Sequence, residues 1–288
     1  MSTSKRFYCL IAVLIMLTGM ATATGEVRMA VRPDPSVEVV LDPPYDFDPD
    51  QMLPRDFGDY FTQDHEVEVT SYPLLPGTEW ENEVLVLKGK EEGPTLYLIA
   101  GVHGGEIAAW MTGNLMKKAG LKAGTLHILS PANPWGANRS PRTRYVTGEE
   151  DLNRSFPGKP DGNAAEMVAD AIFQDVKRVN PTFVFDLHEA ATNVEGRDFL
   201  GNSLIYTSLE KMNDLYLDML LETQLGTLTS VPFDFFSPGP AGSVNRTISE
   251  LLGLPVITVE TYRADPLEMR IANQLSIVQY VLQHYGLI

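Results

Sequence analysis

From residue 65 onward, short β-rich runs alternate with helical patterns, and this alternation constrains the fold more than any other feature of the 288-residue chain. Strands separated by helices of this length are typical of βαβ units, in which helices cover a parallel sheet. Residues 95–101, 182–187 and 255–260 are apolar on both faces, as strands between two helical layers must be. The sequence therefore predicts an α/β fold: a mixed, largely parallel twisted sheet with helices on both faces.

Other segments complete this pattern. Alternating hydrophobicity predicts further strands at residues 65–72, 83–89 and 125–131. Helical periodicity predicts helices at residues 107–120, 163–179, 209–226, 242–253 and 265–286. Ligands of such sheets bind beyond the carboxyl ends of the strands, so polar residues at those ends are the site candidates.

The N-terminal region predicts export. Lys5 and Arg6 precede an apolar run at residues 7–20, and the small residues Ala21-Thr22-Ala23 follow, in the order of a secretory signal peptide. A run of 14 residues is shorter than the roughly 20 that span a bilayer, which disfavours a membrane anchor. We expect a signal peptide at 1–23, an extended arm packed on the domain at 24–64, and one catalytic domain at 65–288. The mature chain is then periplasmic or secreted, with no membrane span.

Cysteine content and charge exclude several classes of site. The single cysteine, Cys9, lies in the predicted signal, so a metal in the mature chain would be held by histidine and carboxylate. The net charge of −16 becomes −18 when residues 1–23 are removed, because they hold two basic side chains and no acidic one. Such a field repels nucleic acid and anionic lipid, so we expect neither as a partner.

Two histidines and a glutamate stand at predicted strand ends. His103 and Glu106, in the segment GVHGGE after the strand at 95–101, are three residues apart at the start of a helix and project on one face. The adjacent glycines would let the backbone approach a bound ion. His188 ends the strand at 182–188. Two histidines and one glutamate with an open fourth position form a catalytic zinc arrangement, although such a set also suits iron.

A further carboxylate, Glu260, ends the strand at 255–260, which is otherwise too apolar to tolerate an unpaired charge. Acting as a general base, it would take a proton from the attacking water and deliver it to the leaving nitrogen. The competing interpretation is a helix cap or a salt bridge with nearby Arg263. Asp186 and Glu189, which flank the end of the strand at 182–188, are expected to be supporting or surface groups.

Positive charge is concentrated in one segment of this acidic chain, at residues 133–158. It contains Arg139, Arg142, Arg144 and Arg154. A guanidinium matches a carboxylate in shape and charge and stabilises a developing oxyanion. The competing interpretation is a set of solvated surface arginines, above all for Arg139 and Arg142.

Taken in order, the segments GVHGGE (101–106), DLNRSFPG (151–158), DLH (186–188) and ITVETYR (257–263) resemble the zinc carboxypeptidase superfamily, including its succinylglutamate desuccinylase/aspartoacylase branch. The resemblance covers residues 83–288. It implies that His103, Glu106 and His188 bind one zinc ion and that Glu260 is the catalytic base. It also implies that Arg144 polarises the scissile carbonyl and that Asn153 and Arg154 hold the substrate carboxylate. Only 28 residues follow Glu260, so we expect a more open cleft than in aspartoacylase-like enzymes, which carry an extra C-terminal β domain.

The resulting prediction is a zinc-dependent hydrolase, outside the cytoplasm, that cleaves an amide or peptide bond next to a free carboxylate. A small peptide and an N-acyl amino acid are both open as substrates, because the exported location favours the former and the GVHGGE motif the latter. The alternative from another class is a catalytically silent protein that binds carboxylates.

Overall fold

The computed structural model of the chain describes residues 66–191, 200–207 and 213–288. The predicted signal peptide (1–23), the predicted arm (24–64) and His65 lie outside these residues. In the part that the structure describes, no helix combines the length and the hydrophobicity needed to cross a bilayer.

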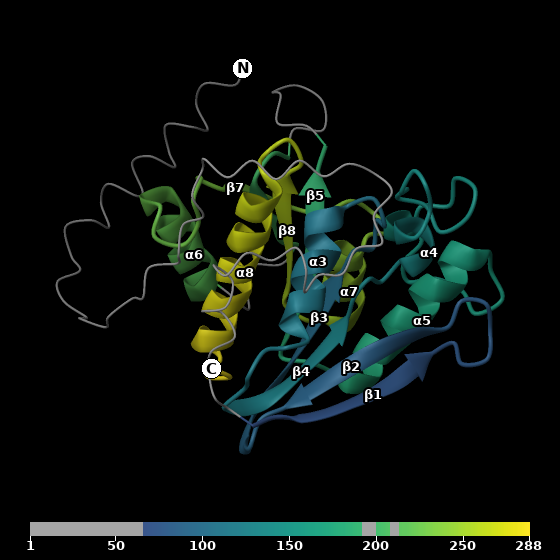
Figure 1. Cartoon of the computed structure of the whole chain (residues 1–288), viewed down its shortest axis with the longest axis horizontal. Coiled ribbons are helices and arrows are strands. Elements are labelled where there is room, and N and C mark those ends of the chain that lie inside the picture. Colours follow the sequence, from purple (N-terminus) through teal and green to yellow (C-terminus); the bar gives the residue numbers. More distant parts are fainter. Residues whose placement is uncertain (1–65, 192–199, 208–212) are drawn as a thin grey trace.

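One eight-stranded sheet forms the centre of the molecule, in the order β1-β2-β4-β3-β5-β8-β6-β7 (Figure 1). The inner strands β4, β3, β5 and β8 run parallel, while β1, β2 and β6 join antiparallel neighbours. The prediction of a mixed, largely parallel sheet is therefore confirmed. The strands are β1 Glu68–Leu74, β2 Asn82–Lys88, β3 Glu91–Ala100, β4 Ala123–Leu129, β5 Phe183–Ala190, β6 Ser203–Ile205, β7 Asp234–Phe236 and β8 Val256–Tyr262.

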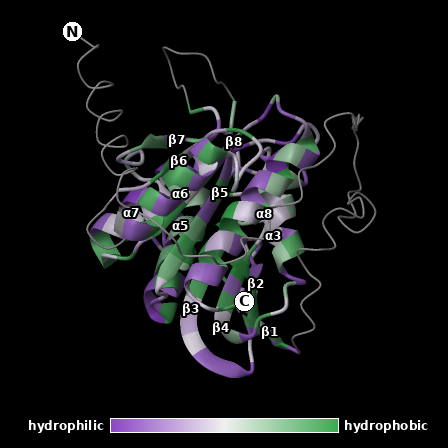
Figure 2. Cartoon of the chain, turned by 90° about the vertical axis from the view of Figure 1, so that its left-hand side faces the viewer, coloured by the Kyte–Doolittle hydropathy of each residue, from purple (hydrophilic) through white to green (hydrophobic). Residues whose placement is uncertain are grey.

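Helices cover both faces of this sheet (Figure 1). On one face α3, α6 and α8 share a core cluster with strand residues such as Leu96 and Leu98. On the other, α5 and α7 pack against residues of the opposite parity, such as Tyr97 and Ile99. The helices are α3 Ile107–Met116, α4 Pro134–Ala137, the 3-10 turn η2 Leu152–Arg154, α5 Ala164–Val179, α6 Asn213–Leu225, α7 Val244–Leu252 and α8 Leu267–His284. They carry both hydrophobic and hydrophilic residues, as one-sided burial requires (Figure 2).

Local signals place the helix ends on the second face. Asn163 caps α5 by accepting a hydrogen bond from the Glu166 backbone N–H, and the Glu166 side chain accepts from the Asn163 N–H in return. Ser243 caps α7, which ends at Gly253 in the left-handed conformation. These caps fix where α5 and α7 begin on this face of the sheet.

The structure adds two strands that the sequence did not predict, β6 and β7. Each has three residues, which is too short for an alternating pattern to be recognised. They extend the sheet beyond β8, so β8 and its Glu260 become internal to the sheet rather than part of an edge.

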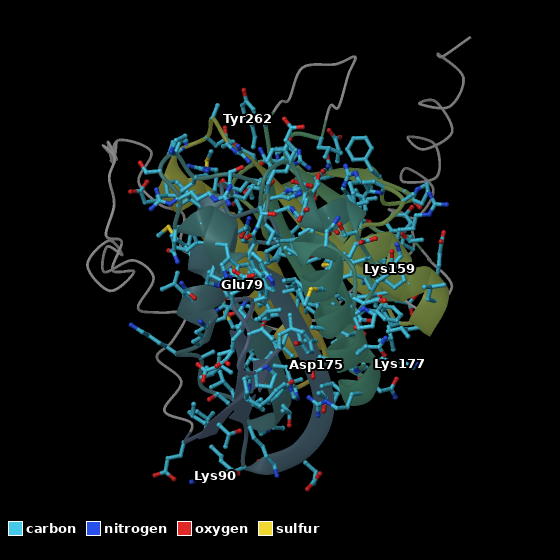
Figure 3. All side chains as sticks on the ribbon, turned by 90° about the vertical axis from the view of Figure 1, so that its right-hand side faces the viewer. Glu79, Lys90, Lys159, Asp175, Lys177 and Tyr262 are labelled. Atoms are coloured by element: carbon cyan, nitrogen blue, oxygen red, sulfur yellow. The ribbon has the colours of Figure 1, made fainter. Side chains whose placement is uncertain are left out.

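The two ends of the sheet differ in what they carry. Figure 3 places Tyr262, the last residue of β8, and Lys90, just before β3, at opposite ends of the molecule. The carboxyl ends of β3, β5 and β8 therefore lie at the Tyr262 end. The predicted site residues of these three strands and the loops that follow them gather there.

A buried carboxylate, Asp175 on α5, ties that helix to the sheet. Its Oδ2 accepts hydrogen bonds from the Tyr72 hydroxyl at 2.8 Å and the Tyr97 hydroxyl at 2.7 Å. We expect Asp175→Ala to lower the free energy of unfolding by about 1–3 kcal/mol, because the fully buried Tyr97 hydroxyl loses its acceptor. Denaturant unfolding measures this. Asp170→Ala, on the same helix with a partner on its exposed side, is the control and should change it by less than about 0.5 kcal/mol. Equal losses would contradict the structural role of Asp175.

Candidate metal and catalytic site

The loop after β3 brings two of the predicted ligands to the sheet end. Gly101 turns the chain with φ +73°, a conformation that L side chains rarely adopt. A Cβ at Gly104 would lie 2.1 Å from the Ala137 backbone nitrogen, so only glycine lets the loop pass α4. The close approach of Gly104 to α4 is a requirement separate from the expected approach of the glycines to an ion. Glu106 then stands at the N-cap position of α3.

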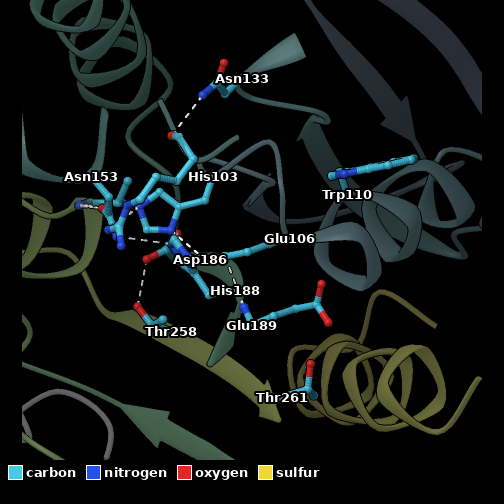
Figure 4. Close-up of polar contacts among 12 residues, drawn as sticks. His103, Glu106, Trp110, Asn133, Asn153, Asp186, His188, Glu189, Thr258 and Thr261 are labelled. Carbon is cyan, nitrogen blue, oxygen red and sulfur yellow. Dashed lines mark hydrogen bonds and ion pairs between the residues drawn. The ribbon is translucent and has the colours of Figure 1, made fainter. Parts of the chain in front are cut away.

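His103, Glu106 and His188 form one buried cluster (Figure 4). One oxygen of the Glu106 carboxylate lies 2.7 Å from His103 Nδ1 and the other lies 2.7 Å from His188 Nδ1. One potential ligand atom from each residue lies within 4.8 Å of the others, and none of the three side chains is more than 7% exposed. Two imidazoles and a carboxylate, drawn together out of water, are the donor set of catalytic zinc. The residues therefore fit the metal that the sequence predicts.

The far sides of the two imidazoles face two further carboxylates. Asp151 Oδ1 lies 3.1 Å from His103 Nε2, and Asp186 Oδ1 lies 3.0 Å from His188 Nε2. Asp186 is itself held by the Thr258 hydroxyl, which donates to its Oδ2 at 2.7 Å. Carboxylates that accept the second N–H of a ligating histidine fix its tautomer and leave the other nitrogen free for a metal. Asp151 therefore favours the His103 tautomer that offers Nδ1, while Asp186 Oδ1 lies near His188 Nε2 without a hydrogen bond among the described residues.

The cluster is electrostatically coupled. Burial alone would raise the pKa of Glu106, but the two imidazoles hold it well below its usual range. Burial alone would lower the pKa of His103 and His188, yet the facing carboxylates raise both. The pKa of Asp151 falls to about 2, because its hydrogen bond with His103 and the charges of His103 and Arg144 outweigh its burial. Glu106 and Asp151 are therefore ionised, and their negative charge makes the cluster attractive to a cation.

Glu260 lies directly beside this cluster, because β5 and β8 pair in register with His188 opposite Glu260. Its side chain is buried, and among the described residues none hydrogen-bonds its carboxyl group. Burial raises the pKa of Glu260 to about 7, with His188 opposing the rise and Glu106 adding to it. The competing salt bridge with Arg263 is not formed, since the Arg263 guanidinium lies 3.4 Å from Glu106 instead. Glu260 is therefore a carboxylate held close to the cluster without a hydrogen-bonding partner in the part of the chain that the structure describes.

The arginine-rich segment divides in two. Arg144 reaches the cluster, with Nη2 2.6 Å from Asp151 Oδ2 and 3.1 Å from His103 Nε2, while its side chain stays 43% exposed. Arg154 is exposed, and its charge acts on Asp151. Arg142 instead lies over the Trp110 ring, and Arg139 is exposed. The structure thus brings Arg144 and Arg154 to the site, whereas Arg142 packs over Trp110 and Arg139 is exposed.

Asn153 lies inside the site rather than at its surface. Its Oδ1 accepts from the Val244 backbone N–H at 2.9 Å, and its Nδ2 lies 3.3 Å from His188 Nε2. The side chain therefore links the first residue of α7 to a predicted metal ligand. Arg154 Nη1 donates to the Asn153 carbonyl at 2.7 Å, which orients the two neighbours together.

Sequence reasoning missed three residues that support the site. Asp151 belongs to the DLNRSFPG segment, but we predicted no role for it. Its carboxylate, two residues before the predicted substrate-binding Asn153, was the available signal. Gln274 and Arg270, one turn apart on α8, contact the end of β5. Helix α8 mixes polar and apolar residues throughout, so its sequence gave no distinct signal for these two. Asp186 is a supporting group, as expected, and Glu189 is buried rather than on the surface.

Comparisons with known proteins agree with this geometry. The sequence profile of the succinylglutamate desuccinylase/aspartoacylase catalytic domain matches residues 92–285, more than half of the chain. N-alpha-acetyl-L-2,4-diaminobutyric acid deacetylase from Halomonas elongata is 35% identical over 115 residues, which are 39% of this chain and 33% of that protein. The chain thus matches about a third of the length of that curated relative.

Solved structures share the fold. An aspartoacylase family protein from Mesorhizobium loti superposes with a TM-score of 0.57 at 21% identity, over 78% of this chain and 69% of that one. A metallo-carboxypeptidase from Burkholderia cenocepacia superposes with a TM-score of 0.55 at 14% identity, over 79% of this chain and 67% of that one. Motifs, site geometry and profile agree, and the chain belongs to the succinylglutamate desuccinylase/aspartoacylase family of hydrolases.

Proposed function

We propose that this protein is a zinc-dependent hydrolase that cleaves an amide bond beside a free carboxylate, using His103, Glu106 and His188 as ligands. The observation that carries the proposal is the buried cluster of these three residues, with Glu260 paired in register beside it. Zinc bound there would polarise the scissile carbonyl and make water a stronger nucleophile. The chain supplies the remaining groups.

Glu260 is the proton carrier in this proposal. Its carboxylate accepts a proton from the attacking water and passes it to the nitrogen of the leaving amine. A general base must be close to the reacting water and free of competing partners. Glu260 meets both conditions, because it lies beside His188 and no described residue hydrogen-bonds it.

Arg144 and Arg154 supply positive charge where substrate would enter. Arg144 lies against the cluster and retains an exposed surface, so its guanidinium can meet the carbonyl oxygen as negative charge develops there. Arg154, fixed by the Asn153 carbonyl and exposed, is placed to bind a substrate carboxylate. The chain as a whole carries a net charge of −16 and repels anions, so these two local cations are what would attract an anionic substrate to the site.

Replacing Arg144 with glutamine should lower kcat about 10²–10³-fold, the usual cost of removing one donor to an oxyanion. Steady-state kinetics on zinc-loaded protein measure the effect. Arg139→Gln removes an exposed arginine from the same segment and is the matched control, with kcat within a factor of two of wild type, roughly the scale of a neutral surface change. A kcat for Arg144→Gln equal to that of the control would remove Arg144 from the reaction.

Of the two substrate classes, we favour N-acyl amino acids. The family profile and the partial match to a deacetylase both support deacylation. A C-terminal peptide is the second candidate, supported by the fold shared with a metallo-carboxypeptidase and by the exposed Arg154.

A matched substrate panel separates these candidates. Purified protein is given N-acyl amino acids and peptides with free C-termini, each with zinc and with chelator. Chelator-sensitive release of the acyl group supports the deacylase, and release of C-terminal residues supports the carboxypeptidase. Saturable binding of these carboxylates by zinc-loaded protein, without turnover of either class, would contradict hydrolysis and favour a carboxylate-binding protein.

We also propose that the protein acts outside the cytoplasm. The support is the order of Lys5 and Arg6, the apolar run at 7–20 and the small residues at 21–23. Expression of the full chain followed by N-terminal sequencing tests it. Cleavage after Ala23 with the product outside the cytoplasm is expected, and an intact cytoplasmic chain would contradict it.

A further inference from the structure

Glu189 is a buried carboxylate next to the cluster that the proposed chemistry does not use. Successive residues of β5 point to opposite faces of the sheet, so His188 faces Asp186 and Asn153 while Glu189 faces α3 and α8. Figure 4 shows its side chain directed away from Asp186 and toward a C-terminal (yellow) helix. Its side chain is 0% exposed, a cost that indicates a role.

The first role of Glu189 is at the start of α3. The N-cap residue of this helix, Glu106, makes no side-chain capping bond, because its carboxylate is turned to the two histidines. Glu189 supplies the missing acceptor, since its Oε2 accepts the Ala108 backbone N–H at 2.9 Å. In return, the Glu189 backbone N–H donates to Glu106 Oε2 at 3.1 Å.

This exchange joins two segments that hold metal ligands. Glu106 belongs to the start of α3, and His188 precedes Glu189 on β5. The reciprocal pair of hydrogen bonds therefore fixes the distance between the Glu106 carboxylate and the end of β5.

Helix α8 completes the arrangement from the other side. The Arg270 guanidinium, 12% exposed, pairs with Glu189 Oε1. One turn later, Gln274 donates from Nε2 to the His188 carbonyl at 2.9 Å and to the Thr261 hydroxyl at 3.0 Å. One face of α8 thus restrains both the backbone of His188 and the side chain of Glu189.

We propose that Glu189, held by Arg270, is a positioning residue that sets the spacing of Glu106 and His188 and thereby the affinity of the site for its metal. The inference rests on the proposed function only in taking the cluster as a metal site. Glu189 contacts no ligand through its side chain. It acts through the backbone of α3 and β5.

Zinc affinity tests this role. The dissociation constant is measured by competition with a fluorescent chelator on the folded full chain, together with the melting temperature of the metal-free protein. Glu189→Ala should weaken zinc binding about 10–100-fold, the usual cost of losing a group that orients metal ligands. Arg270→Met should weaken it in the same direction, and it serves as the second variant if Glu189→Ala does not fold.

Two further variants separate positioning from stability. Asn163→Ala removes the cap of α5, far along the chain from the ligands, and should lower the melting temperature without changing the dissociation constant. The double variant Glu189→Gln with Arg270→Met keeps an acceptor for Ala108 and leaves no buried charge unpaired. The zinc affinity of this double variant should be within roughly a few-fold of the wild-type value, because the hydrogen bond to Ala108 is kept.

The outcomes that oppose the inference differ from those that oppose the proposed function. Wild-type affinity in Glu189→Ala and Arg270→Met, with zinc bound at the cluster, would overturn the positioning role alone. Zinc affinity in wild type no better than in His188→Ala would overturn the metal site, and the inference with it.

Discussion

Glu260→Gln should lower kcat about 10²–10⁴-fold while the protein still binds zinc, because the amide of glutamine cannot accept and deliver the proton. The substitution keeps the size of the side chain in its buried position beside His188. It also removes a buried carboxylate, so the free energy of unfolding should stay the same or rise. Single-turnover kinetics and zinc content on the same preparation measure the loss of rate and the retention of metal. Denaturant unfolding measures the free energy of unfolding.

The matched control is Glu250→Gln, which changes a half-exposed glutamate on α7 that pairs with Arg246. Its kcat should remain within a factor of two of wild type, about the scale of a neutral surface substitution. Turnover by Glu260→Gln at the wild-type rate would show that Glu260 does not carry the proton, whatever the metal content.

His188→Ala should weaken zinc binding by more than about 100-fold, which is the upper value for losing a group that orients a ligand. No change outside the three ligands should weaken it as much. The variant loses one donor of the cluster and leaves Asp186 buried without its imidazole partner. Metal analysis after dialysis against a weak chelator measures the loss, and hydrolysis should fall with it.

His127→Gln is the control for this experiment. His127 is a half-buried histidine whose Nδ1 lies 3.0 Å from the Tyr72 hydroxyl, on β4 and outside the cluster. The His127→Gln variant should retain about one equivalent of zinc per chain, the content that a single zinc site gives in the wild-type protein. Stoichiometric zinc in His188→Ala would contradict the assignment of His188 as a ligand.

Much of the fold follows from local patterns in the sequence. The strands β5 and β8 and the second half of β3 were predictable because both of their faces are buried, which gives largely apolar runs; the exposed start of β3, residues 91–94, was not predicted. Helix α5 was predictable to within one residue, because Asn163 and Glu166 form a capping box. The three-residue strands β6 and β7 were not, since their position depends on pairing with β8 and with each other.

The candidate site divides in the same way. His103, Glu106, His188 and Glu260 were predictable because each stands at or just after the carboxyl end of an apolar strand, where a polar residue needs a reason. The partners Asp151 and Gln274 were not, because they come from segments that reach the cluster only when the sheet and α8 are assembled. Candidate ligands can thus be proposed from the strands that carry them, whereas the groups around them require tertiary structure.

The role of Gly104 illustrates the same limit. From the sequence, the glycines between His103 and Glu106 were interpreted only as letting the backbone approach an ion, and the structure gives Gly104 a further physical reason. The loop passes so close to α4 that a Cβ would lie 2.1 Å from the Ala137 nitrogen. The requirement comes from a segment more than thirty residues later in the chain.

Titration of the metal-free protein with zinc, following hydrolysis of the substrate class that the panel identifies, tests the central claim most directly. The account predicts no activity in the chelated protein and a linear rise with added zinc. The rise should end at one equivalent per chain, about the content of a site with one set of three ligands. Activity that persists without metal, or that stays absent when zinc fills the cluster of His103, Glu106 and His188, would contradict the account.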